Sequence, residues 1–552
     1  MCGSPPVSPL AVHLLVHPSE NRGAFAARIS GAPPAGSGTS GFAAALAALL
    51  VLCLGCADSA RSRPGTPPRH LLLITVDTLR ADHLSAWLYP RETSSFPIDP
   101  ATRGGPLDDS IDGLARAGVQ FARAYAPRGQ TFPSIATLMT GLSPLEHGAR
   151  DNRDLLSGEV PTLAQSLANA GFATGGFTTN QLLSPGSGIE RGFDHFRCDW
   201  TAPDRDLAAL QAASQWFNAR HAEGATRIFT WIHLMGPHLP YDPAPFQGID
   251  FEALFKDSEY AGEANGSREF LDSAYASGRV LSPADVERVI AAYDGEVARI
   301  NRLVSLFILG YANRGAGSDR LEDTLLVFAA DHGEELHQRH GYWGHSKSVH
   351  SSVLHVPLFF RHPRSLTGRR VVGEVVELAD VLPTVHEWFE VPLMGPVAGR
   401  SLLPLVDSHV RRPFASRPAF GHWRDRIFTA STSKWRLIVN PEGVVPDEHP
   451  PGPYAVPVLA LYDLEKDPLE LNDVAAQHPD VVESLRGAID GWLAGLVQRT
   501  GGGALSPERR QALQELGYLG GDSDAASEPV FPAPTHPPAP VSPAPPAPRG
   551  DG

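Results

Sequence analysis

The sequence predicts an α/β protein with a mostly parallel sheet between two layers of helices, followed by a smaller C-terminal α+β region. Continuous apolar runs such as "HLLLITV" (70–76) and "DTLLVFAA" (323–330) lack the polar alternation of a half-exposed strand. These runs alternate with segments of helical pattern, which is typical of parallel sheets because their strands need crossover connections. A chain of 552 residues can bury one large domain, or a large domain and a small one.

The elements after the first run follow the same alternation. "PTLAQSLANAG" (161–171) predicts a helix, because proline lies near its start and glycine follows its end. "FATGGF" (172–177) predicts a short strand, and "RIFTWIHL" (227–234) a buried one.

A long helix is predicted over 282–315. Its apolar positions have helical spacing, and Ser282 and Asp285 form a capping box. Gly295 marks a possible break within it. "HVPLFF" (355–360) and "RRVVGEVVEL" (369–378) predict the last strands of the large domain, which we expect to span 70–405.

After about residue 405 the pattern changes to antiparallel strands. "KWRLIV" (434–439) and "ALYDLEKDP" (460–468) are followed by a helix over 480–496 and a capped terminal helix over 505–521. These elements predict a C-terminal α+β subdomain at 406–520. Proline, alanine and serine dominate 521–552, which predicts a disordered tail.

The N-terminal region, 1–56, contains an apolar segment, "GFAAALAALLVLCLGC" (41–56), that suits a signal-peptide core. It ends in Gly55-Cys56, as bacterial lipoprotein processing sites do, although Cys53 stands where leucine is preferred. We expect an exported lipoprotein that faces the periplasm or cell surface and is attached to the membrane through Cys56, with 57–69 as a Pro-rich linker. A plain secretory signal and an uncleaved anchor remain alternatives.

The net charge of the chain argues against one class of binding partner. The chain carries a formal charge of −15, so it has no basic excess to neutralise nucleic-acid phosphates, and we expect no nucleic-acid partner. An anionic small-molecule substrate is still compatible, because local cations can reverse the field inside a pocket.

Two predicted strands end in acidic residues. Asp77 follows the first strand, and Asp331 and His332 follow the strand at 323–330. Parallel strands bring such residues to one edge of a sheet, and this donor set suits a divalent cation such as Ca²⁺, Mn²⁺ or Zn²⁺. Taken singly, each residue is equally explained as a turn acid or a helix cap.

Seven motifs in order resemble the sulfatase family of the alkaline-phosphatase superfamily, over roughly 70–518. They are "LLLITVDTLRADHLSAWLYPRET", "AYAPRGQTFPSIATLMTGLSPLEHGARDN", "WIHLMGPHLPYDPAPF", "FAADHGEELHQRHGYWGHSKSVH", "ELADVLPTV", "GRSLLPLV" and "LYDLEKDPLELNDVA". The resemblance implies an alkaline-phosphatase-like fold and a metal-dependent hydrolase of sulfuric or phosphoric/phosphonic esters. Its substrate would be a small-molecule, glycan or lipid ester.

The resemblance also implies a role for each matching residue. One divalent metal ion would be held by Asp77, Asp331 and His332 beside Thr131, which stands at the nucleophile position. Substrate oxygens would be oriented by Asn152 and Thr78. Catalytic contacts to the transferred group, and protonation of the leaving group, would come from His238, His345 and Lys347.

The chain departs from the family pattern at the nucleophile. Sulfatases that use formylglycine make it from cysteine or serine in a Cys/Ser-X-Pro-X-Arg setting, whereas this chain has Thr131 and replaces the arginine with Ile135. Oxidation of a secondary hydroxyl gives a ketone and never an aldehyde, so we expect no formylglycine. Thr78 stands where a second metal-binding acid is usual, and fewer carboxylates favour a transition metal over Ca²⁺.

We therefore expect Thr131 to attack the ester directly, as threonine does in related phosphodiesterases and phosphotransferases. A cation would lower the pKa of its hydroxyl. The alternative is that Thr131 caps a helix over 134–140, although Ser134 suits that role better. Two other functions stay open: an envelope phosphotransferase of the phosphoethanolamine or phosphoglycerol type, and a catalytically inactive, surface-anchored binding protein.

Overall fold

The computed structural model describes residues 68–95, 108–312, 319–339, 341–363, 366, 370–407, 410, 412–446, 454–499, 507 and 510–511. The described residues belong to one compact unit, which begins at Ser62. The predicted signal segment, nearly all of the linker, most of the terminal helix and the C-terminal tail lie outside them. Within the described part of the chain, no helix combines the length and apolarity needed to cross a bilayer.

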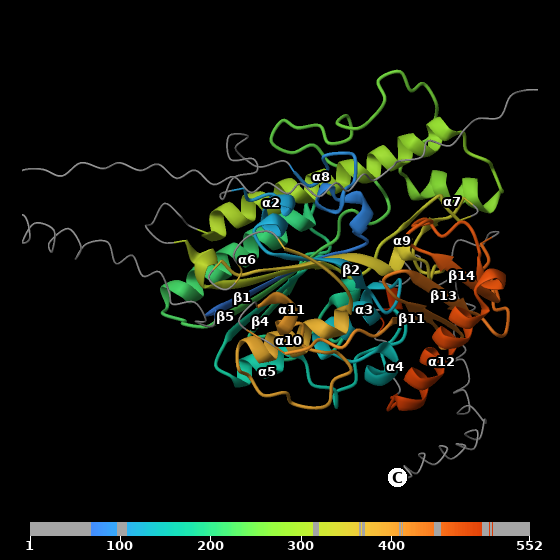
Figure 1. Cartoon of the computed structure of the whole chain (residues 1–552). Helices are drawn as coiled ribbons and strands as arrows, with labels where there is room; N and C mark the ends of the chain where they lie inside the picture. The colour runs from blue at the N-terminus through green and yellow to red at the C-terminus, as the bar shows by residue number, and fades with distance from the viewer. Residues whose placement is uncertain are drawn as a thin grey trace, which may run out of the picture. The chain divides into compact units, whose positions relative to one another are not determined.

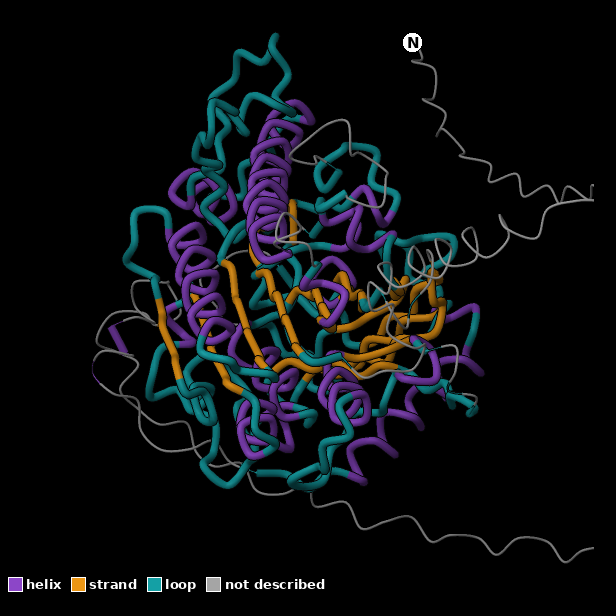
Figure 2. Tube along the Cα trace, turned by 90° about the vertical axis from the view of Figure 1, so that its left-hand side faces the viewer, coloured by secondary structure: helices purple, strands orange, loops and turns teal. Residues whose placement is uncertain are grey.

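An eight-stranded sheet forms the centre of this unit (Figures 1 and 2). Five of its seven strand pairings are parallel, so the predicted mostly parallel sheet is confirmed. The antiparallel member is β9, which pairs with β2 and β6. In spatial order, the strands are β10 (Arg370–Glu377), β2 (Val119–Tyr125), β9 (His355–Arg361), β6 (Thr324–Ala330), β1 (His70–Val76), β5 (Ile228–Leu234), β3 (Ala173–Thr178) and β4 (His195–Cys198).

The helices cover both faces of this sheet (Figure 1). One face carries α2 (Ile111–Arg116), α6 (Arg205–Ala222) and α8 (Pro283–Ala312). The other carries α3 (Thr131–Thr140), α5 (Leu163–Asn169), α10 (Val381–Trp388) and α11 (Leu403–Val406). All residues of β1, β5 and β6 are buried between the two layers, which explains their uninterrupted apolar sequences. Each fully buried Val, Leu, Ile or Phe side chain stabilises the fold by about 1.5–3 kcal/mol.

The remaining elements are short or lie toward the C-terminus. They are α4 (Pro144–His147), α7 (Arg268–Ala276), α9 (Ser351–Leu354), α12 (Pro479–Gly495), the pair β7 (Glu335–Leu336) and β8 (Trp343–Gly344), and the 3₁₀ turns Ala81–His83, Ser85–Trp87, Gln181–Leu183, Arg320–Asp323, Leu378–Asp380 and Ala475–Gln477.

The helix α8 confirms the predicted capping box but not the break. The Ser282 hydroxyl accepts from Asp285 N at 3.2 Å, and Asp285 accepts from Ser282 N at 3.1 Å. The helix runs without interruption through Gly295. A side chain there would lie 2.6 Å from the Phe251 carbonyl oxygen, so the glycine allows a loop to approach the helix closely.

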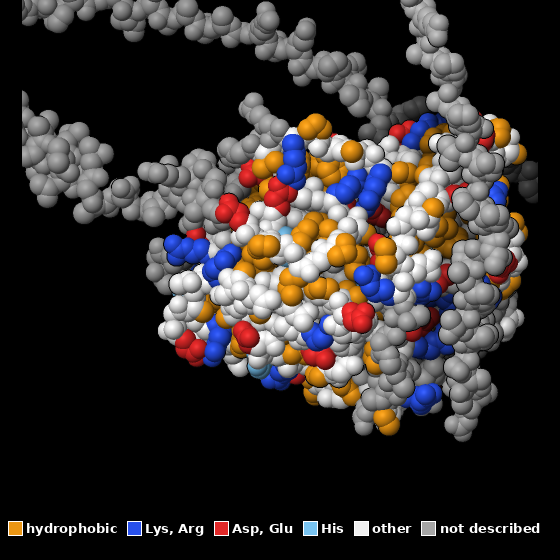
Figure 3. Space-filling model, turned by 90° about the horizontal axis from the view of Figure 1, so that it is seen from below, with side chains coloured by type: hydrophobic (Ala, Val, Ile, Leu, Met, Phe, Trp, Pro, Cys, Tyr) orange, Lys and Arg blue, Asp and Glu red, His pale blue; other side chains and the backbone are white. Residues whose placement is uncertain are grey.

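The C-terminal part is a four-stranded antiparallel sheet in the order β11 (Ala419–Trp423), β12 (Ile427–Ser431), β13 (Trp435–Val439) and β14 (Leu459–Asp463). Apolar residues of α12, including Leu485 and Ile489, pack on one face against Leu437 and Leu461. This arrangement confirms the predicted smaller α+β region. Figure 3 shows that basic and acidic side chains are interspersed on the face seen from below.

Candidate metal and catalytic centre

Two neighbouring parallel strands, β1 and β6, deliver the predicted metal-binding residues to one edge of the sheet. Val76 of β1 lies beside Leu234 of β5 and Ala330 of β6 in the strand register. Asp77 and Asp331, the next residues along β1 and β6, therefore leave the sheet at the same level. Ligand sites of open α/β sheets lie at this carboxyl edge.

Asp77, Asp331 and His332 form a compact set of buried donors. Each offers one ligand atom, and these atoms lie within 4.8 Å of one another. Asp77 Oδ1 and Asp331 Oδ2 are buried and accept no hydrogen bond from the described residues. Buried carboxylate oxygens without partners are costly unless a cation satisfies them. The donor set therefore fits a divalent metal ion.

The pKa values of the two carboxylates are shifted in opposite directions. Burial, followed by the negative charge of Asp77, raises the pKa of Asp331 well above its ordinary value. Burial acts in the same direction on Asp77, but a hydrogen bond from His233 and the charges of His238 and His332 outweigh it and lower the pKa of Asp77. Without a cation, Asp331 is therefore the carboxyl group that holds a proton.

The His332 ring is held in the orientation that metal ligands adopt. Its Nδ1 donates to the Gly333 carbonyl at 2.9 Å, which leaves the Nε2 lone pair facing the carboxylates. Nε2 lies 3.7 Å from both Asp77 Oδ1 and Asp331 Oδ2. Burial and the neighbouring His345 lower the pKa of His332 to about 3, so the ring is neutral and able to ligate.

Thr78 occupies a strained turn directly after Asp77. Its φ is +52°, which is unusual for a β-branched residue. The Tyr293 hydroxyl donates to the Thr78 carbonyl at 2.8 Å and so holds this turn. The backbone N–H donates to Asp331 Oδ1 at 3.3 Å, while the buried side-chain hydroxyl has no described partner. The predicted contact of Thr78 with substrate stays a prediction, and this hydroxyl is its available group.

Thr131 lies directly at the carboxylate pair. Its hydroxyl donates to Asp77 Oδ2 at 3.3 Å and lies 3.5 Å from His332 Nε2. The helix α3 begins at Thr131 rather than at Ser134, so the expected start of the helix is wrong by three residues. Gln130 is the N-cap residue without a side-chain cap, and Ser134 donates to the Arg128 carbonyl instead. Neither Thr131 nor Ser134 caps the helix.

Asn152 lies next to Thr131 and supports the first turn of α3. Its amide oxygen accepts from Phe132 N at 2.9 Å, and the side chain is fully buried. The structure thus places Asn152 where it fixes the backbone beside Thr131, and its predicted contact with the substrate stays a prediction.

His238 and His345 lie together at the same edge, with ring centroids 5.1 Å apart. His238 Nδ1 donates to the Leu239 carbonyl at 2.7 Å, while its Nε2 has no described partner. Burial lowers the pKa of His238 to about 3, so the ring is neutral without a ligand. An anionic group beside Nε2 would raise this pKa and stabilise the charged ring.

His345 is oriented by a buried glutamate that we did not predict. Its Nδ1 donates to Glu334 Oε1 at 2.7 Å, and its ring centroid lies 4.5 Å from that of His332. A carboxylate that accepts from Nδ1 fixes the tautomer and the orientation of the ring. The signal in the sequence was the polar run "DHGEE", in which Glu334 follows Asp331 and His332 closely.

The Lys347 side chain, two residues after His345, lies between aromatic rings. Its ammonium lies 5.3 Å from the centroid of the Tyr275 ring and 5.6 Å from that of Tyr342, and the side chain is buried. Cation–π contacts of this kind stabilise a desolvated ammonium. The predicted contact of Lys347 with the transferred group stays a prediction.

Two further residues of the centre were missed from sequence. Asn180, just beyond β3, donates to Asp77 Oδ2 at 2.7 Å. His233, within β5, places Nε2 3.5 Å from the same oxygen and binds the Thr75 hydroxyl through Nδ1. The rule that located Asp77 also applies to both residues: polar residues at the carboxyl ends of neighbouring parallel strands meet at one edge of the sheet. The strands β1, β5 and β3 are such neighbours.

The C-terminal sheet braces the loop that carries His345. Glu470 is buried, accepts from His350 Nδ1 at 2.6 Å, and also accepts from Ser351 N and Oγ. Arg436 of β13 donates to the Val349 carbonyl at 2.6 Å and lies 3.6 Å from Glu470. The catalytic loop therefore depends on residues more than 80 positions away.

We expect Glu470→Gln to destabilise the protein at neutral pH but not in strong acid. Burial alone would raise the pKa of Glu470, but Arg436 and His350 lower it from 4.5 to about 2. A lowered pKa contributes stability above pH 4.5, and that contribution is lost as the pH falls toward 2. The free energy of unfolding at pH 7 should fall by about 3 kcal/mol.

Denaturant unfolding at pH 7 and pH 3 measures this effect. The exposed Glu465→Gln is the matched control and should change stability by less than about 0.5 kcal/mol. An equal loss for Glu470→Gln at both pH values would contradict the assigned charge interaction.

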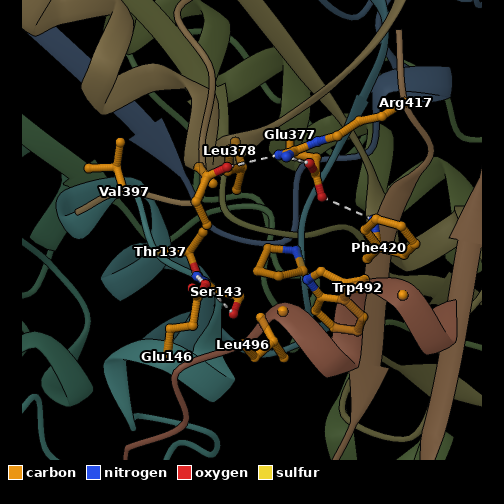
Figure 4. A pocket seen from close by; sticks show the side chains of 15 residues that line it. Thr137, Ser143, Glu146, Glu377, Leu378, Val397, Arg417, Phe420, Trp492 and Leu496 are labelled. Atoms are coloured by element: carbon orange, nitrogen blue, oxygen red, sulfur yellow. Dashed lines mark hydrogen bonds and ion pairs between the residues drawn. The ribbon is translucent and has the colours of Figure 1, made fainter. Parts of the chain in front are cut away.

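A separate cavity of about 330 Å³ lies between α3, α4 and the C-terminal sheet (Figure 4). Its charged groups already bind one another: Arg417 donates to Glu377 at 2.8 Å, and Glu377 accepts from Phe420 N at 3.0 Å. None of the predicted site residues lines it. We therefore assign the chemistry to the strand-end cluster and not to this cavity.

A family model and curated relatives identify the family of the chain. A family model described as Sulfatase matches residues 69–391, which is more than half of the chain. The chain is 25% identical to arylsulfatase K of Gallus gallus over 492 residues, covering 79% of this chain and 84% of the relative. It is 21% identical to an arylsulfatase of Clostridium perfringens, covering 76% of this chain and 92% of the relative.

Solved structures share the fold. The phosphonate monoester hydrolase of Agrobacterium radiobacter aligns with a TM-score of 0.58 at 19% identity, covering 80% of this chain and 100% of that one. A protein solved in complex with its substrate D-glucosamine-2-N,6-O-disulfate aligns with a TM-score of 0.58 at 17% identity, covering 78% and 98%. These likenesses confirm the predicted alkaline-phosphatase-like fold class.

Proposed function

The chain belongs to the sulfatase family of ester hydrolases, and we propose that it is a metal-dependent member in which unmodified Thr131 attacks the ester. One observation carries this proposal. The Thr131 hydroxyl lies 3.3 Å from Asp77 Oδ2 and 3.5 Å from His332 Nε2, within the cluster of donors that fits a divalent ion. A hydroxyl that capped a helix would face backbone N–H groups instead.

Asp77, Asp331 and His332 would hold the ion. When bound there, a divalent cation such as Mn²⁺, Zn²⁺ or Ca²⁺ would lower the pKa of the Thr131 hydroxyl and polarise the ester oxygen. Asn180 and the Gly333 carbonyl would hold Asp77 and His332 in place through the hydrogen bonds described above.

The protein's own groups then perform two displacements. Thr131 Oγ1 gives its proton to Asp77 Oδ2 and forms a bond to the central atom as the bond to the leaving oxygen breaks. His345, held by Glu334, gives the proton of Nε2 to that oxygen. In the second step water attacks the same atom and gives a proton to His345 Nε2, while the bond to Thr131 breaks and Thr131 Oγ1 takes its proton back from Asp77. His238 Nε2 would neutralise charge on the transferred group.

Thr131 favours phosphorus esters over sulfate esters. A formylglycine hydrate releases sulfate by regenerating its aldehyde, but a threonine ester has no such exit. Water must then attack at the central atom, which suits phosphoryl and phosphonyl groups better than sulfuryl groups. The fold shared with a phosphonate monoester hydrolase supports this preference.

A panel of aryl esters tests the proposed function. Hydrolysis of p-nitrophenyl phosphate, p-nitrophenyl sulfate and p-nitrophenyl phenylphosphonate would be measured with Mn²⁺, Zn²⁺ or Ca²⁺ and with a chelator. We expect metal-dependent turnover with the phosphorus esters preferred. A clear preference for the sulfate would contradict the substrate class, and no turnover with any metal would contradict the hydrolase.

His345→Ala should slow esters with poor leaving groups far more than esters with good ones. An alkoxide needs a proton to leave, whereas p-nitrophenolate does not. We expect roughly a hundredfold or greater loss for a methyl ester and less than about tenfold for the nitrophenyl ester of the same acid. Glu334→Gln should give the same pattern more weakly. Equal losses on both esters would remove His345 as the proton donor.

The inactive-protein alternative is not favoured by the site, because the three donors and the hydroxyl are all in place. The phosphotransferase alternative differs only in the acceptor of the second step. Product analysis in the ester panel separates it from hydrolysis, since a transferase would place the phosphoryl group on an added alcohol.

We also propose that the mature chain begins at Cys56 as a lipoprotein, with 57–69 tethering a catalytic domain at 70–405 and a subdomain at 406–520. The apolar segment that ends in Gly55-Cys56 supports this. We expect Cys56→Ser to move the protein from the membrane to the soluble fraction and to lower its mass by the lipid. Retention in the membrane at unchanged mass would contradict it. A membrane-bound enzyme would meet small, glycan or lipid esters outside the cytoplasm.

A further inference from the structure

The helix α7 lies against two parts of the catalytic centre. It belongs to the segment between β5 and α8 (Figure 1). Arg268, its first residue, reaches the loop that carries His238. Tyr275, near its other end, contacts the Lys347 ammonium. One short helix therefore spans from the His238 loop to the loop of His345 and Lys347.

Arg268 shares an acceptor with the catalytic imidazole. Its Nη2 donates to the Leu239 carbonyl at 3.4 Å, and the same oxygen accepts from His238 Nδ1 at 2.7 Å. The guanidinium thus lies on the Nδ1 side of the ring, while Nε2 on the opposite side has no described partner. Burial is the main cause of the lowered pKa of His238, and the positive charge of Arg268 adds to it.

Arg268 also differs from other arginines in this region. Arg288 and Arg299 of α8 form ion pairs with Glu252 and Asp204. Arg268 forms no such ion pair with a carboxylate of the described residues. Its only hydrogen bond to the described residues is the long one to the Leu239 carbonyl. Its side chain is half-buried and so remains open to solvent. A guanidinium in this position can bind an incoming anion without first breaking an ion pair.

We propose that Arg268 binds a second anionic group, carried by the leaving group of the ester. This inference rests on the proposed function, because the transferred group must occupy the space between Thr131 and His238 Nε2. Arg268 lies beyond the Nδ1 side of that ring, one imidazole ring farther from the transferred group, and its side chain is half-buried. The substrate class is therefore an ester whose leaving group carries its own carboxylate, sulfate or phosphate.

A pair of esters that differ only in the charge of the leaving group tests this. The ester type would be the one that the enzyme hydrolyses best, with p-nitrophenol or a carboxylated p-nitrophenol as the leaving group. We expect kcat/KM to favour the carboxylated ester by roughly 10- to 100-fold, mainly through KM. Arg268→Gln should remove this preference, with a much larger loss of kcat/KM on the carboxylated ester than on the neutral one.

Glutamine at position 268 keeps a donor for the Leu239 carbonyl and loses the positive charge. Loss of the preference in this variant therefore reports anion binding and not the position of the loop. Arg279→Gln is the matched control: Arg279 is exposed just beyond α7 and stacks on Phe270. No preference in the parent enzyme, or equal losses on both esters in Arg268→Gln, would overturn the inference.

Binding of product-like anions gives a readout that does not need turnover. Calorimetry would compare benzene-1,3-disulfonate with benzenesulfonate. We expect tighter binding of the disulfonate, and loss of the difference in Arg268→Gln. If the difference is present without hydrolysis, the proposed function fails and the second anion site stands. If hydrolysis occurs and the difference is absent, only the second anion site fails.

Discussion

Replacing Thr131 with alanine should lower kcat/KM by roughly a thousandfold or more, because it removes the attacking oxygen. The stability should change by no more than about 1 kcal/mol, since the hydroxyl caps no helix and donates only to Asp77. Thr131→Ser keeps a hydroxyl and should retain much more of the activity. Steady-state kinetics on the preferred aryl ester, with thermal unfolding of the same samples, measures both effects.

Thr140→Ala is the matched control on the same helix. Thr140 is also buried, but its hydroxyl donates to the Ala136 carbonyl and lies outside the donor cluster. It should leave turnover nearly unchanged. If Thr131→Ala keeps turnover within tenfold of the parent, Thr131 does not act as the nucleophile.

Asp331→Asn should abolish both metal binding and turnover, again by roughly a thousandfold or more. Divalent ions should raise the midpoint of thermal unfolding of the parent, because a bound ion at 100 times its Kd adds about 2.7 kcal/mol of stability. This response should disappear in the variant. Without metal, Asp331→Asn should be at least as stable as the parent, since it removes a carboxyl group that burial and Asp77 force to hold a proton.

Two comparisons sharpen the metal experiment. Asn180→Ala removes a hydrogen bond to Asp77 and should weaken metal binding by roughly 10- to 100-fold. Asp199→Asn is the control: this aspartate also follows a strand of the same sheet, but it pairs with Arg197. A metal response in Asp331→Asn equal to that of the parent would show that the ion binds elsewhere.

The sequence predicted the layers and the cluster of Asp77, Asp331 and His332 because strand periodicity is a local signal. The fully buried β1 and β6 read as continuous apolar runs, and the acids that follow them could only meet at one edge. The antiparallel direction of β9 had no such signal, since a buried strand has the same apolar pattern in either direction.

The errors and omissions at the site have physical reasons. The start of α3 was placed too late, because Gln130 begins it without a side-chain cap and no cap signal marks Thr131. Glu334 acts through a tertiary contact with His345, which no local spacing reveals. Glu470 contacts His350 in the loop that follows His345, about 120 residues earlier in the chain. This contact could not be predicted before the fold was known.

The stereochemical course of hydrolysis tests direct attack by Thr131 most directly. A phosphorothioate ester that is chiral at phosphorus would be hydrolysed in isotopically labelled water, and the configuration of the product determined. Two in-line displacements, the first by Thr131 and the second by water, predict net retention of configuration. Net inversion would show that water attacks the ester in a single step and would contradict a covalent intermediate on Thr131.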